Sequence, residues 1–153
     1  MACEFLANEI QPVSLYSPIL FRASIPCRKG YVYHEDETGN FILRGVVNNN
    51  SCFAHYQVTY NGNIALPEDA TDVVPIAVAL TINGEPRLTS RAIFTPAAVD
   101  EYGNVTSTAI IKVPKGCCFS LGIEAVPATT DPTVTPAPII DVQNANLTIA
   151  RIA

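Results

Sequence analysis

Apolar and polar residues alternate with a period of two along most of this chain. Successive side chains of an extended strand point to opposite faces, so the alternation predicts half-buried β-strands. About ten such segments follow one another at spacings of about 8–14 residues, which predicts an all-β fold, a single jelly-roll β-sandwich of about ten antiparallel strands. The clearest strands are expected at 19–25, 31–34, 40–44, 54–60, 74–82, 91–95, 105–113, 117–125 and 140–153.

The segment 74–82 is apolar at both odd and even positions. Its even positions hold large residues, whereas its odd positions include Ala77, Ala79 and Thr81. A strand of this kind is buried on both faces. We expect its small-residue face to pack against a neighbouring subunit.

Turn residues and a change of phase set the expected strand boundaries. The charged segment 35–39 predicts a hairpin, and Asn83-Gly84 predicts a tight turn. The segment 61–63, Asn-Gly-Asn, is expected to end the strand at 54–60. In the last strand the apolar positions switch from even to odd, which predicts a β-bulge near Gln143-Asn144. Residues 127–138 contain four prolines and are expected to form a stiff, exposed loop.

The first seventeen residues are predicted to form an arm, and 18–153 the folded domain. Pro12 and Pro18 bracket a run too short for a central strand. The arm carries apolar residues without a core of its own, so we expect it to order on the surface of a larger particle. Its anchoring residues are predicted to be Phe5, Leu6, Ile10, Val13 and Leu15.

The composition favours subunit assembly and argues against polyanionic partners. Charged residues make up 15% of the chain, below the roughly 25% of an ordinary soluble domain. The net charge is −5, so neither nucleic acid nor an anionic membrane is an expected partner. No apolar run approaches the roughly 20 residues that span a bilayer. Neutral surface is what subunit interfaces bury.

The sequence begins without a basic region and a long apolar segment, so we expect synthesis in a cytosol. An odd number of cysteines in such a protein favours reduced thiols. The adjacent pair Cys117-Cys118 is expected to pack as small hydrophobic residues. The cysteines are Cys3, Cys27, Cys52, Cys117 and Cys118.

No catalytic residues, metal site or cofactor is expected. Residues 34–37, His-Glu-Asp-Glu, and Asp100-Glu101 are possible metal ligands, but solvated acidic turns account for both. The sequence has no nucleophile motif for which His55 could act as a general base, so His55 is expected at a surface or interface.

Several short motifs carry a family resemblance when they are taken in order. The motifs are 39–41 (Gly-Asn-Phe), 56–58 (Tyr-Gln-Val), 80–84 (Leu-Thr-Ile-Asn-Gly), 113–116 (Val-Pro-Lys-Gly) and the closing segment 145–153. Over residues 18–153 this order resembles the jelly roll shared by tumour necrosis factor and the globular head of the first complement component. The resemblance implies a tight trimer. The chain departs from complement-like members because it has no Gly-X-Y stalk and no glycine before Tyr56.

The implied trimer assembles around strands with small and aromatic outer residues. The resemblance therefore places at the trimer interface Tyr56, Tyr60, Ala77, Ala79 and Thr81.

Loop residues are the expected contacts with an outer partner. Exposed, preorganised loops bind at a low cost in ordering. These residues are Tyr102, Thr130, Asp131 and Thr133.

A second resemblance bears on function. The segments 61–67, 82–86, 94–99 and 116–118 are similar to small proteins encoded by prophages and genomes of gut Gram-positive bacteria. We therefore expect a non-enzymatic, homotrimeric structural protein of a bacteriophage particle, such as a capsid decoration or head-fibre protein. It would assemble in the host cytoplasm, and its partners would be its own copies and a capsid or other virion protein. The alternatives are a bacterial surface or spore-coat trimer of the same fold, and a host-receptor-binding module.

Overall fold

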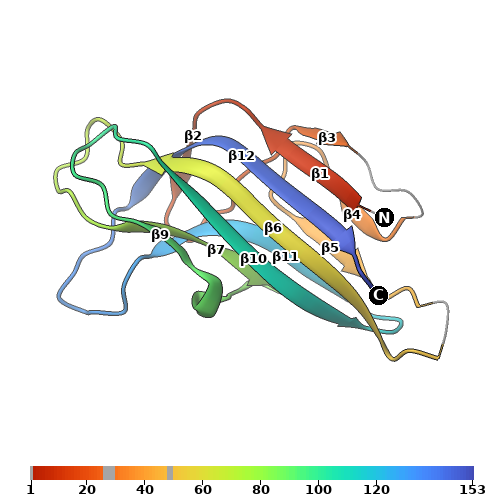
Figure 1. Cartoon of the computed structure of the whole chain (residues 1–153). Helices are drawn as coiled ribbons and strands as arrows, with labels where there is room; N and C mark the ends of the chain where they lie inside the picture. Colours follow the sequence, from red (N-terminus) through yellow and green to blue (C-terminus); the bar gives the residue numbers. More distant parts are fainter. Residues whose placement is uncertain (1, 26–29, 48–49) are drawn as a thin grey trace.

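The computed structural model describes residues 2–25, 30–47 and 50–153, and within them the chain folds into two antiparallel β-sheets. The sheets pack face to face as a sandwich (Figure 1). The all-β sandwich expected from the alternation is confirmed.

Sheet A contains both the first and the last strand. Its strand order is β10-β6-β12-β1-β3, and β2 also pairs with β12. Its strands are β1 (Ala2–Ala7), β2 (Gln11–Ser14), β3 (Ala23–Ile25), β6 (Phe53–Ala65), β10 (Gly103–Pro114) and β12 (Ile139–Arg151).

Sheet B forms the other layer. Its strand order is β4-β5-β11-β7-β8, and β9 pairs with the same strand, β7, as β8 does. Its strands are β4 (Val32–His34), β5 (Phe41–Arg44), β7 (Ile76–Ile82), β8 (Glu85–Pro86), β9 (Ala92–Phe94) and β11 (Cys118–Pro127). One 3₁₀ turn, η1 (Leu88–Ser90), connects β8 to β9.

The core lies between the two sheets and is built by the inward positions of each strand. In β6 alternate residues are buried, and β7 is buried on both faces, as its sequence predicted. Aromatic rings fill the end of the sandwich beneath β1, where Phe41 lies 4.6 Å from Phe5 and 5.4 Å from Phe21 between ring centroids. Edge-on aromatic pairs of this kind add to the stability that burial supplies.

The expectation that 61–63 ends a strand is wrong. β6 continues to Ala65, because Asn61 pairs with β10 on one side and with β12 on the other. Pairing on both edges overrides the low strand propensity of Asn and Gly. A Cβ at Gly62 would collide with the hydroxyl of Tyr60, so the glycine makes room for this buried ring.

Other boundary predictions are confirmed. The β6–β12 register shifts between Gln143 and Asn146, and Asn144 has φ 53°, which is the predicted bulge. Asn83 and Gly84 both have positive φ, as a two-residue hairpin turn requires. β4 and β5 pair as the hairpin around 35–39.

The expectation of a separate N-terminal arm is wrong. β1 lies between β12 and β3, and β2 pairs with the first part of β12. Phe5 and Val13 are buried in the sandwich core, Leu6 and Leu15 are half-buried, and Ile10 alone of the five predicted anchoring residues is exposed. Long-range pairing with β12 accounts for this, since strand pairing satisfies the arm's backbone and buries its apolar side chains.

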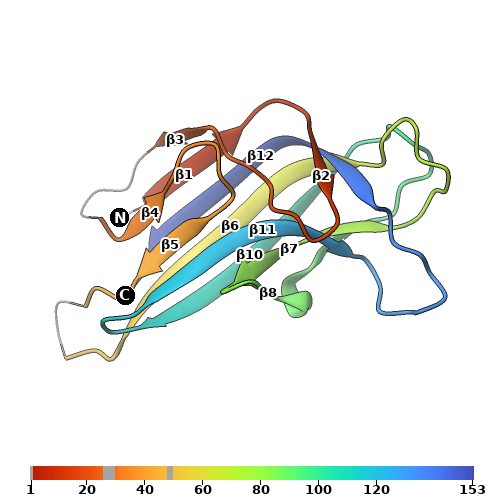
Figure 2. The ribbon, with the colours of Figure 1, turned by 180° about the vertical axis from the view of Figure 1, so that it is seen from behind.

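After β2 the chain crosses from sheet A to sheet B. Figure 2 shows this segment reaching the edge of β11. There the backbone N–H of Tyr16 donates to Ala125 O at 2.7 Å, and that of Ile19 donates to Ile123 O at 2.8 Å. The crossing closes the edge of β11 next to the proline-rich loop.

The cysteine expectations are also wrong in part. Cys3 is disulfide-bonded, whereas Cys52, Cys117 and Cys118 are free and exposed. Cys27 lies outside the described residues. The pair Cys117-Cys118 is exposed because it follows the turn at Gly116, which has φ 81°, at the tip of the β10–β11 hairpin.

We predict that Phe5→Ala costs about 3–5 kcal/mol of unfolding free energy, because it leaves a cavity beside Phe41. The matched control Ile10→Ala, at an exposed position of the same N-terminal segment, should change stability by less than about 0.5 kcal/mol. Urea unfolding followed by circular dichroism measures both. Deletion of residues 2–12 should abolish folding, and a folded protein after that deletion would contradict the integrated role of β1.

Candidate functional site

Part of the outward face of sheet A carries few charges, and it is bordered on β1 by Glu4, whose carboxylate accepts a hydrogen bond from Asn146 Nδ2 at 2.6 Å. It is formed by the outward positions of β6, β10 and β12. These positions carry two charged side chains in the described strands, Lys112 at one end and Asp141 at the other. We call this surface face A.

Threonine and asparagine side chains form hydrogen-bonded rows across the middle of face A. The hydroxyls of Thr59 and Thr108 lie 3.3 Å apart, and Thr106 Oγ1 donates to Asn61 Oδ1 at 3.2 Å. A third row follows, with Asn104 Nδ2 3.1 Å from Asn63 Oδ1. These pairs fix the side chains in place, so ordering them against a partner costs less conformational entropy.

One end of face A is apolar. Phe53, Ile110 and Ile152 are exposed there, and the ammonium group of Lys112 lies 4.6 Å from the centre of the Phe53 ring. The backbone N–H of His55 donates to Ala153 O at 2.9 Å, which holds the C-terminal residues beside β6. Exposed apolar groups on a charge-poor sheet face are typical of a contact surface.

The predicted interface residues of β6 do not lie on this face. Tyr56 and Tyr60 point inward and are fully buried in the core of a single chain, so they cannot contact a second one. The hydroxyl of Tyr56 donates to Arg44 O at 2.6 Å. On β6 the outward side chains are His55, Gln57 and Thr59, which alternate with the two tyrosines. The sequence prediction therefore assigned the interface to the wrong face of β6.

The predicted interface residues of β7 lie on the outward side of sheet B. Ala77 and Ala79 form a small cluster with Val126 and Ala128, and both alanines are almost fully buried within the chain. Thr81 is also buried. These residues leave little surface for a partner to cover, because neighbouring groups of the same chain already bury them.

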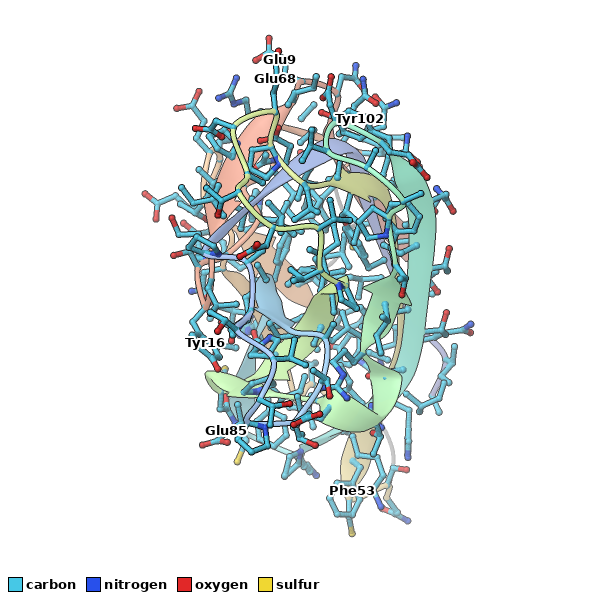
Figure 3. The ribbon with its side chains drawn as sticks, turned by 90° about the vertical axis from the view of Figure 1, so that its left-hand side faces the viewer. Glu9, Tyr16, Phe53, Glu68, Glu85 and Tyr102 are labelled. Carbon is cyan, nitrogen blue, oxygen red and sulfur yellow. The ribbon has the colours of Figure 1, made fainter. Side chains whose placement is uncertain are left out.

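The predicted outer-contact residues separate into two places. Thr130, Asp131 and Thr133 lie in the loop after β11, where Asp131 Oδ1 accepts hydrogen bonds from Thr133 N at 2.9 Å and Thr133 Oγ1 at 2.8 Å. These bonds lower the pKa of the Asp131 carboxyl and stiffen the loop. Tyr102 lies elsewhere, near Glu68 and at a distance from Tyr16 (Figure 3).

Tyr102 belongs to an acidic end of the molecule. Burial and the nearby carboxylates of Asp141 and Asp100 raise its pKa. Burial also raises the pKa of Asp141, and the neighbouring Asp100 and Asp69 add to this shift. The carboxylates at this end repel one another. In the described part of the chain, no three His, Cys, Asp or Glu side chains are grouped so that they could hold a metal ion.

The histidine of the acidic turn has a structural role. Its ring stacks on Phe41 at 4.2 Å, and His34 Nε2 lies 2.9 Å from Thr38 O. The imidazole therefore covers the aromatic core and closes the turn, and it does not form a metal site with Glu35 or Glu37.

Among the described residues, no helix is long and apolar enough to cross a bilayer.

A groove lies on the outward side of sheet B and was not predicted from the sequence. It has a volume of about 370 Å³ and is lined by Tyr16, Pro86, Leu88, Arg91, Val126, Pro127, Thr129 and Thr130. Tyr16 is 59% exposed and has φ 63°. No sequence pattern joins these residues, because they come from three separate segments, at 16, 86–91 and 126–130.

Comparison with known proteins identifies the fold. No protein-family model and no curated protein matches the sequence. Among solved structures, the globular domain of zebrafish complement 1qA is 14% identical, with a TM-score of 0.62, and the match covers 99% of this chain and 97% of that one.

Two further solved structures share this fold. The Eiger TNF of S. frugiperda is 14% identical, with a TM-score of 0.61 and coverage of 100% and 92%. Murine APRIL is 9% identical, with a TM-score of 0.55 and coverage of 99% and 100%. The chain therefore has the jelly-roll fold of tumour necrosis factor and complement head domains, as its motifs suggested.

We predict that Asp141→Asn raises the melting temperature at pH 7. The folded-state pKa of Asp141 is raised, so its ionised form costs stability above that pKa, and the cost disappears at low pH where the carboxyl is protonated in both states. The gain should vanish at pH 3 in thermal melts. Asp36→Asn, in an exposed turn, is the matched control and should have no effect. An Asp141→Asn gain that persists at pH 3 would show a different cause.

Proposed function

We propose that this sandwich is a non-enzymatic homotrimer that assembles through face A. The observation that supports the proposal most strongly is the near absence of charge across the outward positions of β6, β10 and β12. Charged residues are depleted in the cores of protein interfaces, because their desolvation is costly. In the trimer that the family resemblance implies, face A forms the contact between subunits.

The apolar end and the middle of face A suit different parts of the interface. The exposed Phe53, Ile110 and Ile152 supply apolar surface, whose burial is worth about 25 cal/mol per Å². The Thr and Asn rows supply side chains that already have hydrogen-bond partners, so packing against them leaves few unsatisfied groups. Face A thus replaces the β7 surface as the proposed trimer contact.

We further propose that the trimer is a structural component of a bacteriophage particle, as a capsid decoration or head-fibre protein. This role is motivated by the resemblance to prophage-encoded proteins noted from the sequence of 61–67, 82–86, 94–99 and 116–118. A disulfide at Cys3 is compatible with assembly in a host cytoplasm followed by release into an oxidising medium. The capsid or another virion protein is then the second partner.

Attachment to the particle cannot use a free arm, because β1 and β2 belong to sheet A. We propose the turn around Ile10 as the attachment point. Ile10 is exposed there, beside the ion pair between Glu9 and Arg22 at 2.6 Å. A short turn between two paired strands can bind a preformed site at a lower ordering cost than a free arm.

We predict that the wild-type protein has about three times the monomer mass of 16.4 kDa in light scattering at micromolar concentration. Ile110→Glu should shift it to monomer, because an unpaired charge in a desolvated interface is costly. Ile93→Glu is the matched control, since Ile93 is 48% and Ile110 is 50% exposed, and it lies on the outward side of sheet B. It should leave the trimer intact.

Two outcomes count against the proposal. A monomeric wild type removes the trimer itself. Dissociation by Ile93→Glu without an effect of Ile110→Glu moves the contact to sheet B and restores the surface around Ala77 and Ala79 as the interface.

The role in a particle is tested by mass spectrometry of purified virions and spores from a producing strain. The proposal expects the protein in virions, and an Ile10→Asp variant that trimerises but is lost from them. Leu88→Asp, at a comparably exposed position in the turn η1, is the control that should be retained. Recovery from spores or cell walls in place of virions would favour the surface or spore-coat alternative.

A further inference from the structure

The groove on the outward side of sheet B combines an aromatic ring, a cation and hydroxyl groups in one small hollow. Tyr16, Arg91, Thr129 and Thr130 all line it, and none of its lining residues is acidic. In a chain with net charge −5, an arginine without an acidic neighbour in the groove is a local site for an anion.

Arg91 is held in place but keeps unused donors. Its Nη1 donates to Pro127 O at 3.1 Å, and its backbone N–H donates to Leu88 O at 3.3 Å. Its Nε is buried and has no hydrogen-bond partner among the described residues. A carboxylate is the group whose geometry best matches a guanidinium.

Tyr16 is held in an unfavourable conformation beside this cation. A positive φ is costly for a bulky residue, and such conformations are concentrated at ligand-binding sites. The hydrogen bond from Tyr16 N to Ala125 O fixes the backbone, and the ring projects outward from the flank opposite β10 (Figure 3). An exposed tyrosine ring presents a flat apolar face with a polar tip.

The shape of the groove favours a saccharide over a peptide. Both edges of β7 are paired, with β11 on one side and with β8 and β9 on the other, so an extended peptide finds no edge to extend along this strand. Val126 lines the groove and is nearly fully buried, in one cluster with Ala77 and Ala79. A volume of about 370 Å³ is within the range of small-ligand sites.

We infer that this groove binds a saccharide that carries a carboxylate. The carboxylate pairs with the guanidinium of Arg91, the sugar ring packs on Tyr16, and sugar hydroxyls bond to Thr129 and Thr130. A single cation suits a singly charged carboxylate better than a phosphate. The inference goes beyond the proposed assembly and does not depend on it, because one chain builds the groove and face A lies on the other sheet.

The test is calorimetric titration of the full chain with a tetrasaccharide of alternating glucuronate and N-acetylglucosamine. The wild type should bind saturably, and the carboxyl-reduced tetrasaccharide should bind at least about tenfold more weakly. Arg91→Gln should cause a similar loss for the native tetrasaccharide.

Tyr16→Gly removes the ring and suits the positive φ, so it should keep or raise the melting temperature while it weakens binding at least about tenfold. Tyr33→Ala is the matched control, since Tyr33 is 61% exposed on β4 of the same sheet, and its affinity should equal that of the wild type.

Three results overturn the inference. They are no binding by the folded wild type at millimolar tetrasaccharide, unchanged affinity in Tyr16→Gly, and Arg91-dependent binding of the acidic peptide acetyl-Glu-Glu-Thr-Glu-amide in place of the sugar. None of them bears on the oligomeric state, so a failure here is distinct from a failure of the trimer.

Discussion

The pairing of β12 on both of its edges is the constraint on which the rest of the structure depends. β12 is hydrogen-bonded to β6 along one edge and to β1 and β2 along the other. It therefore joins the two ends of the chain and the middle of the sequence in one sheet. These contacts span most of the chain, so they bring a large loop-closure cost that the buried core must offset.

This central pairing also determines which surfaces remain available. With β1 locked beside β12, the N-terminal segment adds to the core, and of its five predicted anchoring residues Ile10 alone is exposed. The outward positions of β6, β10 and β12 then form one charge-poor face, while the crossing at Tyr16 shapes a groove on the opposite sheet. The two surfaces suit different partners, a second copy and a small anionic ligand.

Much of the fold followed from the sequence, because period-two alternation is a local signal. Its change of phase predicted the bulge after Gln143, apolar residues at both odd and even positions predicted the doubly buried β7, and the Asn83-Gly84 pair predicted the hairpin turn. Long-range pairing is not a local signal, so the integration of β1 and the continuation of β6 were missed. β10 and β12 pair with opposite edges of β6 and hold its Asn and Gly residues in the strand despite their low strand propensity.

The candidate surfaces were less predictable for a related reason. Alternation shows that a strand has two faces but not which face is inside, and Tyr56 and Tyr60 were assigned to the wrong one. The outward Thr and Asn positions had no distinctive composition until β6, β10 and β12 were placed side by side. The groove joins Tyr16 and Arg91 only through the packing of separate segments.

A crystal structure of the assembled protein tests the central claim most directly. The account predicts three copies around a threefold axis with Thr59, Thr108 and Ile110 buried between them. Copies that meet through sheet B, or that leave Ile110 exposed, would contradict it.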